Sequence, residues 1–270
     1  MTCVMNGVEG TVPAKESLFL KHTATVGEHL IHCRIGGSGP TLLMLHGMTL
    51  TGAQWLPFAE HFTDSYRVIV ADLPGHGGSS PLEGAFSFKQ AAQLLHVLLD
   101  ELKSSPVYGI GHSAGGITLL NMAVQQPERF EALVLVDGPH RIGSAGRKFV
   151  REDTWEALPG ESKEWYRHMH PGGQPQAEFI YKQYNGLAES HEDIPVEVLK
   201  TLPMRTLLVW GDRDPYFPLE LPMEMYHALP HAALWVIPGQ EHTPLWVDMG
   251  GSVEAARLFT RMTTDFFAGK

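Results

Sequence analysis

Cysteine is almost missing from this chain of 270 residues, which contains only Cys3 and Cys33. Two cysteines cannot form the disulfide framework of a small secreted domain, and they do not have the paired spacing of a zinc site. Long apolar runs are missing as well, because no stretch approaches the roughly 18 apolar residues that span a bilayer. The N-terminus does not combine a charged segment with a sustained apolar run, as a secretory signal does. We therefore expect a cytoplasmic protein that does not contact membranes.

Basic residues are also in the minority. Twenty lysines and arginines stand against 30 aspartates and glutamates, which gives a formal net charge of -10. This balance repels phosphate backbones, so nucleic acid is not an expected partner. No phosphate loop, dinucleotide fingerprint or H-E-x-x-H pair occurs, and we expect neither a cofactor nor a metal. His168 and His170 stand two apart, but they form the weakest of metal-site candidates.

The hydrophobic residues, 43% of the chain, are arranged in short runs that alternate with amphipathic stretches. Such alternation is typical of a mostly parallel sheet with helices on both faces. Residues 18–27 and 29–39 are expected to form an antiparallel hairpin at the edge of the sheet, with Gly27 near its turn. The other six predicted strands are 41–47, 66–75, 106–113, 130–138, 204–214 and 233–242. The fold class is therefore α/β, with an eight-stranded sheet flanked by helices such as 87–102.

The alternation stops after Gly138 and resumes near Met204. An intervening segment of this length is too long for an ordinary loop. We expect residues 139–202 to form a helical lid inserted into a core made of residues 1–138 and 203–270. The alternative is that these helices pack elsewhere and serve stability alone.

The sequence Gly-His-Ser-Ala-Gly at positions 111–115 follows a predicted strand and precedes a predicted helix. In this context G-x-S-x-G forms a sharp turn that exposes the serine hydroxyl at the helix N-terminus. Glycines on both sides let the strand and the helix approach closely. Ser113 is therefore a candidate nucleophile, whereas the alternative is a small residue in a glycine-rich turn.

A serine hydroxyl becomes nucleophilic when a histidine takes its proton and an acid orients that histidine. Among 15 histidines, His242 lies at the end of the last predicted strand, on the same sheet edge as Ser113. We expect His112, next to the serine, to point away from it. Asp214 is the preferred acid because Pro215 begins a loop that leads away from the sheet. Asp212, which is better placed to tie the turn, and Asp137, at the end of another strand, remain alternatives.

With these motifs in order, residues 30–267 resemble the α/β-hydrolase superfamily. Residues 45–55 resemble the family's HG oxyanion loop, and residues 71–80 resemble its D-x-P-G-x-G-x-S loop. The resemblance implies an oxyanion hole made by the backbone N–H groups of Met48 and Ala114, with His46 supporting the loop. His76 is expected to face solvent. One departure from the family pattern is Glu241, because a glycine often precedes the catalytic histidine there.

Substrate specificity is expected to come from the lid and the nearby loops. Aromatic side chains line many ligand pockets, but they are equally useful for packing a lid onto a sheet. The candidate substrate-binding residues are Trp155, Trp165, Tyr184, Trp246 and His140. His140 and Arg141 either meet a polar end of the substrate or lie in a solvated loop. The expected partner is a small molecule with an apolar portion, and the sequence does not indicate an oligomeric state.

Three functions fit these residues. The first is a serine hydrolase that cleaves a small carboxylic ester or lactone through an acyl-enzyme. The second is a relative that hydrolyses a carbon-carbon bond next to a ketone, as ring-cleavage hydrolases with these motifs do. The third is a ligand-binding receptor that keeps the three side chains, binds its ligand and turns over slowly.

Overall fold

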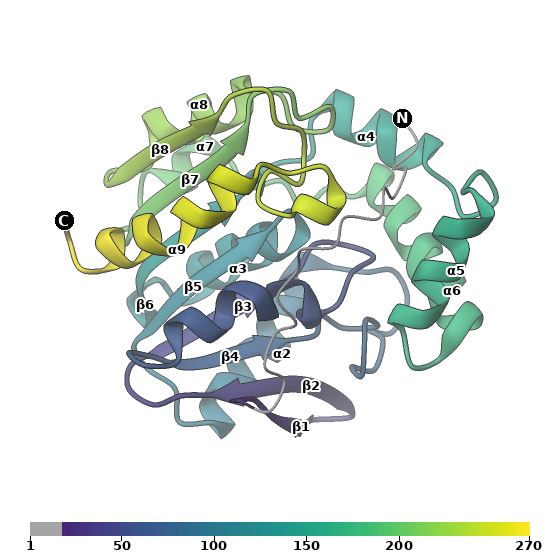
Figure 1. Cartoon of the computed structure of the whole chain (residues 1–270), viewed down its shortest axis with the longest axis horizontal. Coiled ribbons are helices and arrows are strands. Elements are labelled where there is room, and N and C mark those ends of the chain that lie inside the picture. Colours follow the sequence, from purple (N-terminus) through teal and green to yellow (C-terminus); the bar gives the residue numbers. More distant parts are fainter. Residues whose placement is uncertain (1–17) are drawn as a thin grey trace.

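Eight strands form one sheet in the computed structural model, which describes residues 18–270 (Figure 1). Their order across the sheet is β1-β2-β4-β3-β5-β6-β7-β8. Strand β2 pairs antiparallel with both β1 and β4, and all other neighbouring strands pair parallel. The strands are β1 (Leu20–Val26), β2 (His29–Gly36), β3 (Thr41–Leu45), β4 (Arg67–Ala71), β5 (Val107–His112), β6 (Phe130–Val136), β7 (Arg205–Gly211) and β8 (Ala232–Ile237). The predicted mostly parallel α/β sheet is confirmed.

The edge hairpin of β1 and β2 forms as the sequence predicts. Val26 pairs with His29 across the turn, where Gly27 has a φ of +61°. A residue without a side chain adopts this left-handed conformation at little cost. Cys33 is buried in β2 with a free thiol, whereas Cys3 lies outside the described residues.

Successive side chains of the central strands alternate between two apolar layers. In β3, Leu43 and Leu45 join one core cluster, while Leu42 and Met44 join the other. This is the two-sided burial expected of parallel strands covered by helices on both faces. Each fully buried large side chain contributes roughly 1.5–3 kcal/mol to folding. Both faces of the central strands are therefore packed into the core.

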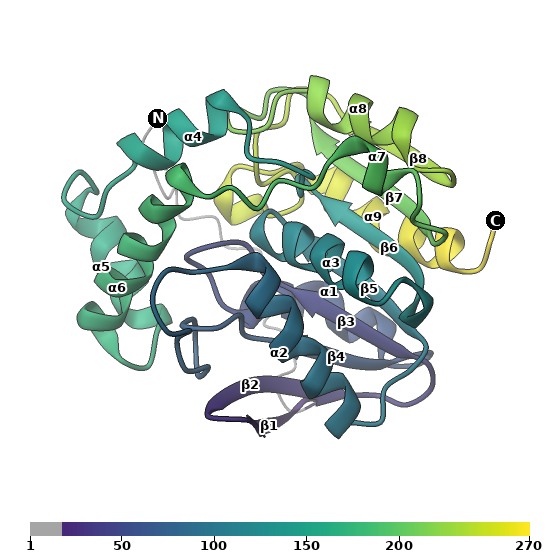
Figure 2. The same ribbon diagram turned by 180° about the vertical axis from the view of Figure 1, so that it is seen from behind.

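Helices cover both faces of the sheet. On the face seen in Figure 1, α9 (Val253–Phe267) lies over the strands, and Phe259 stacks on Trp55 beside α1 (Leu56–Ala59) with ring centroids 5.9 Å apart. The other face carries α2 (Phe88–Glu101), α3 (Ala114–Gln125) and α8 (Glu220–Ala228), which lie in front in Figure 2.

Residues 139–202, here called the helical insertion, connect β6 to β7 without a strand. Its helices are α4 (Ser144–Glu152), α5 (Gly160–Met169), α6 (Gly173–Gly186) and α7 (Val196–Leu199). Both views show α5 and α6 beyond the edge of the sheet, next to the loops that follow β3 and β4 (Figures 1 and 2). In the described part of the chain, no helix is both long and apolar enough to cross a membrane.

Candidate active site

Ser113 occupies a strained turn between β5 and α3. Its φ of 51° and ψ of -117° lie where a residue with a side chain is rarely found, and its N–H donates to the Val136 oxygen at 2.8 Å. The flanking glycines are required sterically. A Cβ on Gly111 would come within 2.6 Å of the Gly115 backbone, and one on Gly115 would come within 2.2 Å of the Leu45 oxygen. The local sequence therefore forces the hydroxyl to the N-terminus of α3.

The structure brings Ser113, His242 and Asp214 together in one hydrogen-bonded chain. His242 Nε2 lies 2.9 Å from Ser113 Oγ, and His242 Nδ1 lies 2.7 Å from Asp214 Oδ2. Ser113 is partly exposed, and the His242 side chain is 16% exposed, so a ligand can reach both. The Asp214 side chain is completely buried. This arrangement suits proton transfer from the hydroxyl to the imidazole.

The Asp214 carboxylate is fixed by its own loop. Its Oδ1 accepts hydrogen bonds from the N–H groups of Tyr216 and Phe217, at 2.8 and 3.0 Å. Asp212, the first alternative acid, is exposed and accepts from the Gly239 N–H instead, so it ties the turn after β8. Asp137, the second alternative, lies beside Asp214 in the buried interior and makes no hydrogen bond to His242.

His112 lies against the back of His242. The two rings are 5.1 Å apart, and His112 Nε2 donates to the His242 backbone oxygen at 2.9 Å. Its Nδ1 accepts from Gln54 Nε2 at 3.0 Å, while Gln54 Oε1 accepts from the Gly47 N–H. Burial and the neighbouring His242 hold the pKa of His112 well below its usual range. A neutral His112 thus supports the backbone of the loop that carries His242.

The two amides predicted to form an oxyanion hole lie at the start of α3 and in the loop after β3. Ala114 is the first residue of α3, and an N–H at this position has no partner within its own helix. In the loop after β3, the Gly47 N–H donates to Gln54 and the Thr49 N–H donates to His76. Among residues 18–270, the intervening Met48 N–H makes no such bond. Thr49 has a φ of +68°, which gives this loop its sharp bend.

His76 does not face solvent, so this prediction is wrong. Its side chain is buried, with Nδ1 donating to the Pro74 oxygen at 3.0 Å and Nε2 accepting from Thr49 at 3.2 Å. His46 is similarly enclosed between the Gly47 oxygen and the Leu73 N–H. Burial lowers the pKa of His46 to about 4 and holds that of His76 well below its usual range. Both rings are therefore neutral and structural.

The loop that follows β4 is built around Asp72. The carboxylate accepts from the N–H groups of Gly52 and Gly78 and from His32 Nδ1. Burial alone would raise the pKa of Asp72, but these hydrogen bonds, with that of His32 the largest, lower it to about 2. A Cβ on Gly77 would come within 2.1 Å of the carboxylate. The structural role predicted for this loop fits these contacts.

The helical insertion contacts the loops after β3 and β4. His170 Nε2 donates to the Thr49 oxygen at 3.0 Å, and Gln176 Nε2 donates to the oxygens of Gly75 and Gly77. His168 is exposed, whereas His170 is buried and turned toward these loops. The pair therefore does not converge on a common metal ion.

Three of the predicted substrate-binding residues make contacts within the insertion or with α8. Trp155 packs on Tyr181 inside the insertion, and Tyr184 packs against the same ring. His140 is buried, with Nδ1 donating to the Ile194 oxygen at 2.7 Å and Nε2 lying 3.2 Å from Glu224. These contacts occupy both nitrogens of His140, so it ties the insertion to α8.

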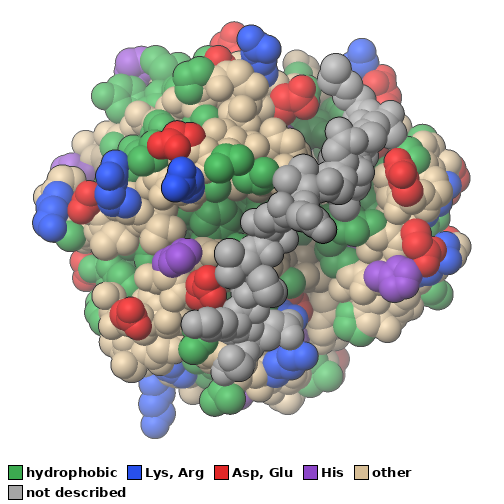
Figure 3. Space-filling view, in the orientation of Figure 1, with side chains coloured by type: hydrophobic (Ala, Val, Ile, Leu, Met, Phe, Trp, Pro, Cys, Tyr) green, Lys and Arg blue, Asp and Glu red, His purple; other side chains and the backbone are tan. Residues whose placement is uncertain are grey.

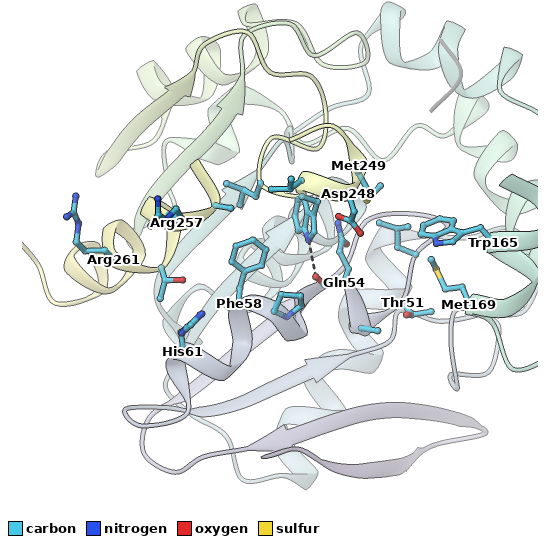
Figure 4. Close-up of a pocket in the computed structure, with 18 residues that line it drawn as sticks. Thr51, Gln54, Phe58, His61, Trp165, Met169, Asp248, Met249, Arg257 and Arg261 are labelled. Atoms are coloured by element: carbon cyan, nitrogen blue, oxygen red, sulfur yellow. Dashed lines mark hydrogen bonds between the residues drawn. The ribbon is translucent and has the colours of Figure 1, made fainter. Parts of the chain in front are cut away.

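Trp165 and Trp246 line a groove of about 720 Å³ (Figure 4). The groove extends from Trp165 and Met169, past Phe58, to Arg257 and Arg261 on α9. Hydrophobic side chains gather near the middle of this face, and charged ones lie around them (Figure 3). The lining does not include the three hydrogen-bonded residues. Trp246 forms a wall between the groove and the His242 loop, because it contacts His112 and donates Nε1–H to the Gln54 oxygen.

Sequence reasoning missed the aromatic surroundings of His242. The ring of Tyr216 lies 4.6 Å from the imidazole and that of Phe217 lies 5.3 Å from it. Both residues directly follow the Asp-Pro pair at 214–215, and this proximity in sequence was the available signal. Glu241, by contrast, is exposed.

One group of acidic and histidine side chains in residues 18–270 is close enough to share an ion. Its members are Asp137, Asp214 and His242, with ligand atoms within 4.8 Å of one another. Both nitrogens of His242 already form hydrogen bonds, to Asp214 and to Ser113. This arrangement favours proton transfer over metal coordination.

The chain is similar to several known hydrolases. Residues 40–157 match the family model described as the alpha/beta hydrolase fold. A fluoroacetate dehalogenase from Burkholderia sp is 36% identical over 165 residues, which cover 58% of this chain and 52% of the relative, so the match spans about half of that protein. A 2-hydroxy-6-oxononadienedioate/2-hydroxy-6-oxononatrienedioate hydrolase from Pseudomonas sp is 28% identical over 267 residues, covering 88% of this chain and 92% of the relative. The structure of a thermophilic esterase from Thermogutta terrifontis superposes with a TM-score of 0.73 at 25% identity, covering 93% and 98% of the two chains.

Proposed function

The chain belongs to the α/β-hydrolase superfamily and is a hydrolase, and from this premise we propose that it cleaves a small carboxylic ester or lactone through an acyl-enzyme on Ser113. The observation that carries the proposal is the hydrogen-bonded chain from Asp214 through His242 to Ser113, at 2.7 and 2.9 Å. The strained backbone of Ser113 supports it further, because such strain is typical of a nucleophile held up for attack.

In the proposed mechanism, Ser113 Oγ attacks the carbonyl carbon while His242 Nε2 takes the hydroxyl proton. Asp214 stabilises the imidazolium that forms. The tetrahedral oxyanion accepts hydrogen bonds from the Met48 and Ala114 N–H groups, each worth about 10² to 10³ in kcat. His242 then protonates the departing alkoxide, and the acyl group remains on Ser113.

Water completes the cycle. His242 removes a proton from the water as its oxygen attacks the acyl carbon, and Ser113 Oγ leaves as it regains a proton from His242. The carboxylic acid is released. Only the side chains and amides already described are needed for these steps.

We also propose that the helical insertion is a lid over this site and that the substrate is a small molecule with an apolar portion. Two contacts support the lid: His170 bonds to the Thr49 oxygen, and the Tyr166 hydroxyl lies 3.5 Å from Thr49 Oγ1. Both put the insertion directly on the oxyanion loop. The rings of Tyr216 and Phe217 beside His242 support an apolar substrate group.

A second candidate is hydrolysis of a carbon-carbon bond next to a ketone. It is favoured by the Pseudomonas relative, whose similarity extends over 88% of this chain. The same serine, histidine and oxyanion amides would serve this reaction.

One comparison tests the ester proposal against this alternative. The wild type and Ser113→Ala are assayed with a chain-length series of p-nitrophenyl esters, with lactones and with a vinylogous diketone. We expect turnover of esters or lactones that Ser113→Ala abolishes. Faster turnover of the diketone by the wild type would reject the ester proposal in favour of the second candidate. Ester turnover that survives in Ser113→Ala would reject both.

A further inference from the structure

A second carboxyl group, that of Asp137, is buried beside Asp214. Asp137 directly follows β6 and is 0% exposed. Its Oδ1 accepts a hydrogen bond from the Gly211 N–H at 3.1 Å, whereas its Oδ2 is buried without a partner. An oxygen of this carboxyl lies within 4.8 Å of ligand atoms of both Asp214 and His242. A buried acceptor without a donor is destabilising, so the free oxygen needs an explanation.

The backbone of Asp137 is fixed by its neighbours. Its φ is +44°, a conformation that is unfavourable for most residues, and its N–H donates to the Val209 oxygen at 2.9 Å. The next residue, Gly138, packs against Gly116 of α3 so closely that an added Cβ would lie 2.8 Å from the Gly116 Cα. The carboxyl is therefore held between the ends of β6 and β7.

No cation compensates a second negative charge at this place in the described structure. The ionisable groups nearby are Asp214 and His242, then His112 and Tyr216, which contact His242, and the exposed Glu241 on the His242 loop. Two adjacent buried carboxyls cannot both ionise readily. Burial, and secondarily the charge of Asp214, hold the pKa of Asp137 well above its usual range.

The hydrogen bonds decide which carboxyl keeps the proton. Asp214 accepts from the N–H groups of Tyr216 and Phe217 and from His242, and these three donors stabilise its ionised form. Asp137 accepts from one backbone N–H and has a free oxygen. A proton on that oxygen turns it from an unsatisfied acceptor into a donor.

We propose that Asp137 is a positioning residue whose protonated carboxyl donates a hydrogen bond to Asp214 and holds that carboxylate toward His242. The proton stays on Asp137 throughout the reaction, so the pair carries one negative charge. His242 therefore faces a single carboxylate of fixed orientation. The effect on catalysis rests on the proposed function of Ser113, whereas the protonation state of Asp137 does not.

The first test compares pH profiles of kcat/KM for an ester. Asp137→Asn keeps a neutral side-chain donor, and asparagine tolerates a positive φ. We expect it to keep the acidic limb of the wild-type profile and to retain most of the activity that Asp137→Ala loses, a loss of about tenfold or more. Asp212→Asn, which removes an exposed carboxylate from the neighbouring loop, is the matched control.

An acidic limb displaced by about one pH unit or more in Asp137→Asn, but not in Asp212→Asn, would mean that Asp137 is ionised, and would overturn the proposal. Equal losses of activity in Asp137→Asn and Asp137→Ala would also overturn it, because the donor would then have no effect.

The second test does not need activity. The infrared difference spectrum between the wild type and Asp137→Asn at neutral pH should contain the C=O band of a protonated carboxyl. The spectrum for Asp212→Asn should contain carboxylate bands only. If Asp137→Asn also changes only carboxylate bands, the proposal is wrong. If the protein turns over no ester but the band of the protonated carboxyl is present, the proposed function of Ser113 is wrong, whereas the proposed protonation of Asp137 is confirmed.

Discussion

Different kinds of contact hold the carboxyl edge of the sheet and the helical insertion in place. At the sheet edge, three residues other than glycine have positive φ angles, Thr49, Ser113 and Asp137. Ser113 and Asp137 donate their N–H groups to backbone oxygens, and the Thr49 N–H donates to the buried ring of His76. The insertion packs around its own aromatic cluster and is joined to the loops by side-chain bonds such as those of His170 and Gln176. In the proposed function, the sheet edge carries out the chemistry and the insertion controls access to it.

The largest expected effect lies at the sheet edge. Asp214→Asn should lower kcat about 10⁴-fold, because the asparagine no longer holds the imidazole in the orientation and tautomer that accept the Ser113 proton. Steady-state kinetics on the best ester would measure it, and Asp212→Asn should stay within about twofold of wild type. An equal loss in both variants would contradict the assignment of Asp214.

Gln54 has no ionisable group, yet we expect its side chain to hold two loops at the carboxyl edge of the sheet in position. It bonds both the Gly47 N–H and His112, so Gln54→Ala should loosen the oxyanion loop and the His242 loop together. We expect kcat to fall about 30-fold, equivalent to about 2 kcal/mol, with KM little changed. Gln90→Ala, at an exposed glutamine of α2, should have no effect. A change confined to KM would show that Gln54 does not support the reacting groups.

Because histidines at the sheet edge are buried in their neutral form, the free energy of unfolding should decrease at acidic pH. The pKa of His46 is about 4 in the folded chain, against 6.5 for its ordinary value. Between about pH 4 and pH 6.5, His46 binds a proton in the unfolded chain but not in the folded one. The contribution of neutral His46 to the free energy of unfolding is therefore complete above about pH 6.5 and is lost as the pH falls toward 4. The slope is about 1.4 kcal/mol per pH unit, a tenfold change in the unfolding equilibrium.

Urea unfolding between about pH 7.5 and pH 5 measures this slope. His46→Gln should reduce it by the equivalent of one proton, whereas His168→Gln, at an exposed histidine, should leave it unchanged. An unchanged slope in His46→Gln would mean that His46 is not held neutral.

The smallest expected effect lies at the attachment of the insertion. Gln176→Ala removes the bonds to the Gly75 and Gly77 oxygens and should raise KM about threefold with kcat nearly constant. Gln174→Ala, which removes only a bond to Glu178 on the same helix, is the control. A fall in kcat with unchanged KM in Gln176→Ala would contradict the division between a chemical edge and an access-controlling insertion.

The sequence was most informative about the sheet edge. Strand runs ending in polar residues predicted where Ser113, Asp214 and His242 would lie, because parallel strands end at a common edge. The burial of His76 was not predicted, since its loop is rich in glycine and proline and gives no sign that Thr49 donates to its ring. Gln54 was missed because its bond to His112 spans 58 residues.

The insertion was harder to interpret from the sequence. Its aromatic residues were recognised, but an amphipathic pattern does not say which neighbour a ring will contact. Trp155 and Tyr184 pack within the insertion, whereas Trp165 lines the groove. His140 is bonded to Ile194 and Glu224, which are 54 and 84 residues away, and no local signal indicates such contacts.

The central claim is that Ser113 is an activated nucleophile. The most direct measurement is labelling with a fluorophosphonate probe, followed by peptide mass spectrometry of the wild type and Ser113→Ala. The account predicts one adduct on the peptide that contains Ser113 and none in the variant. An adduct on another residue, or none on the folded wild type, would contradict it.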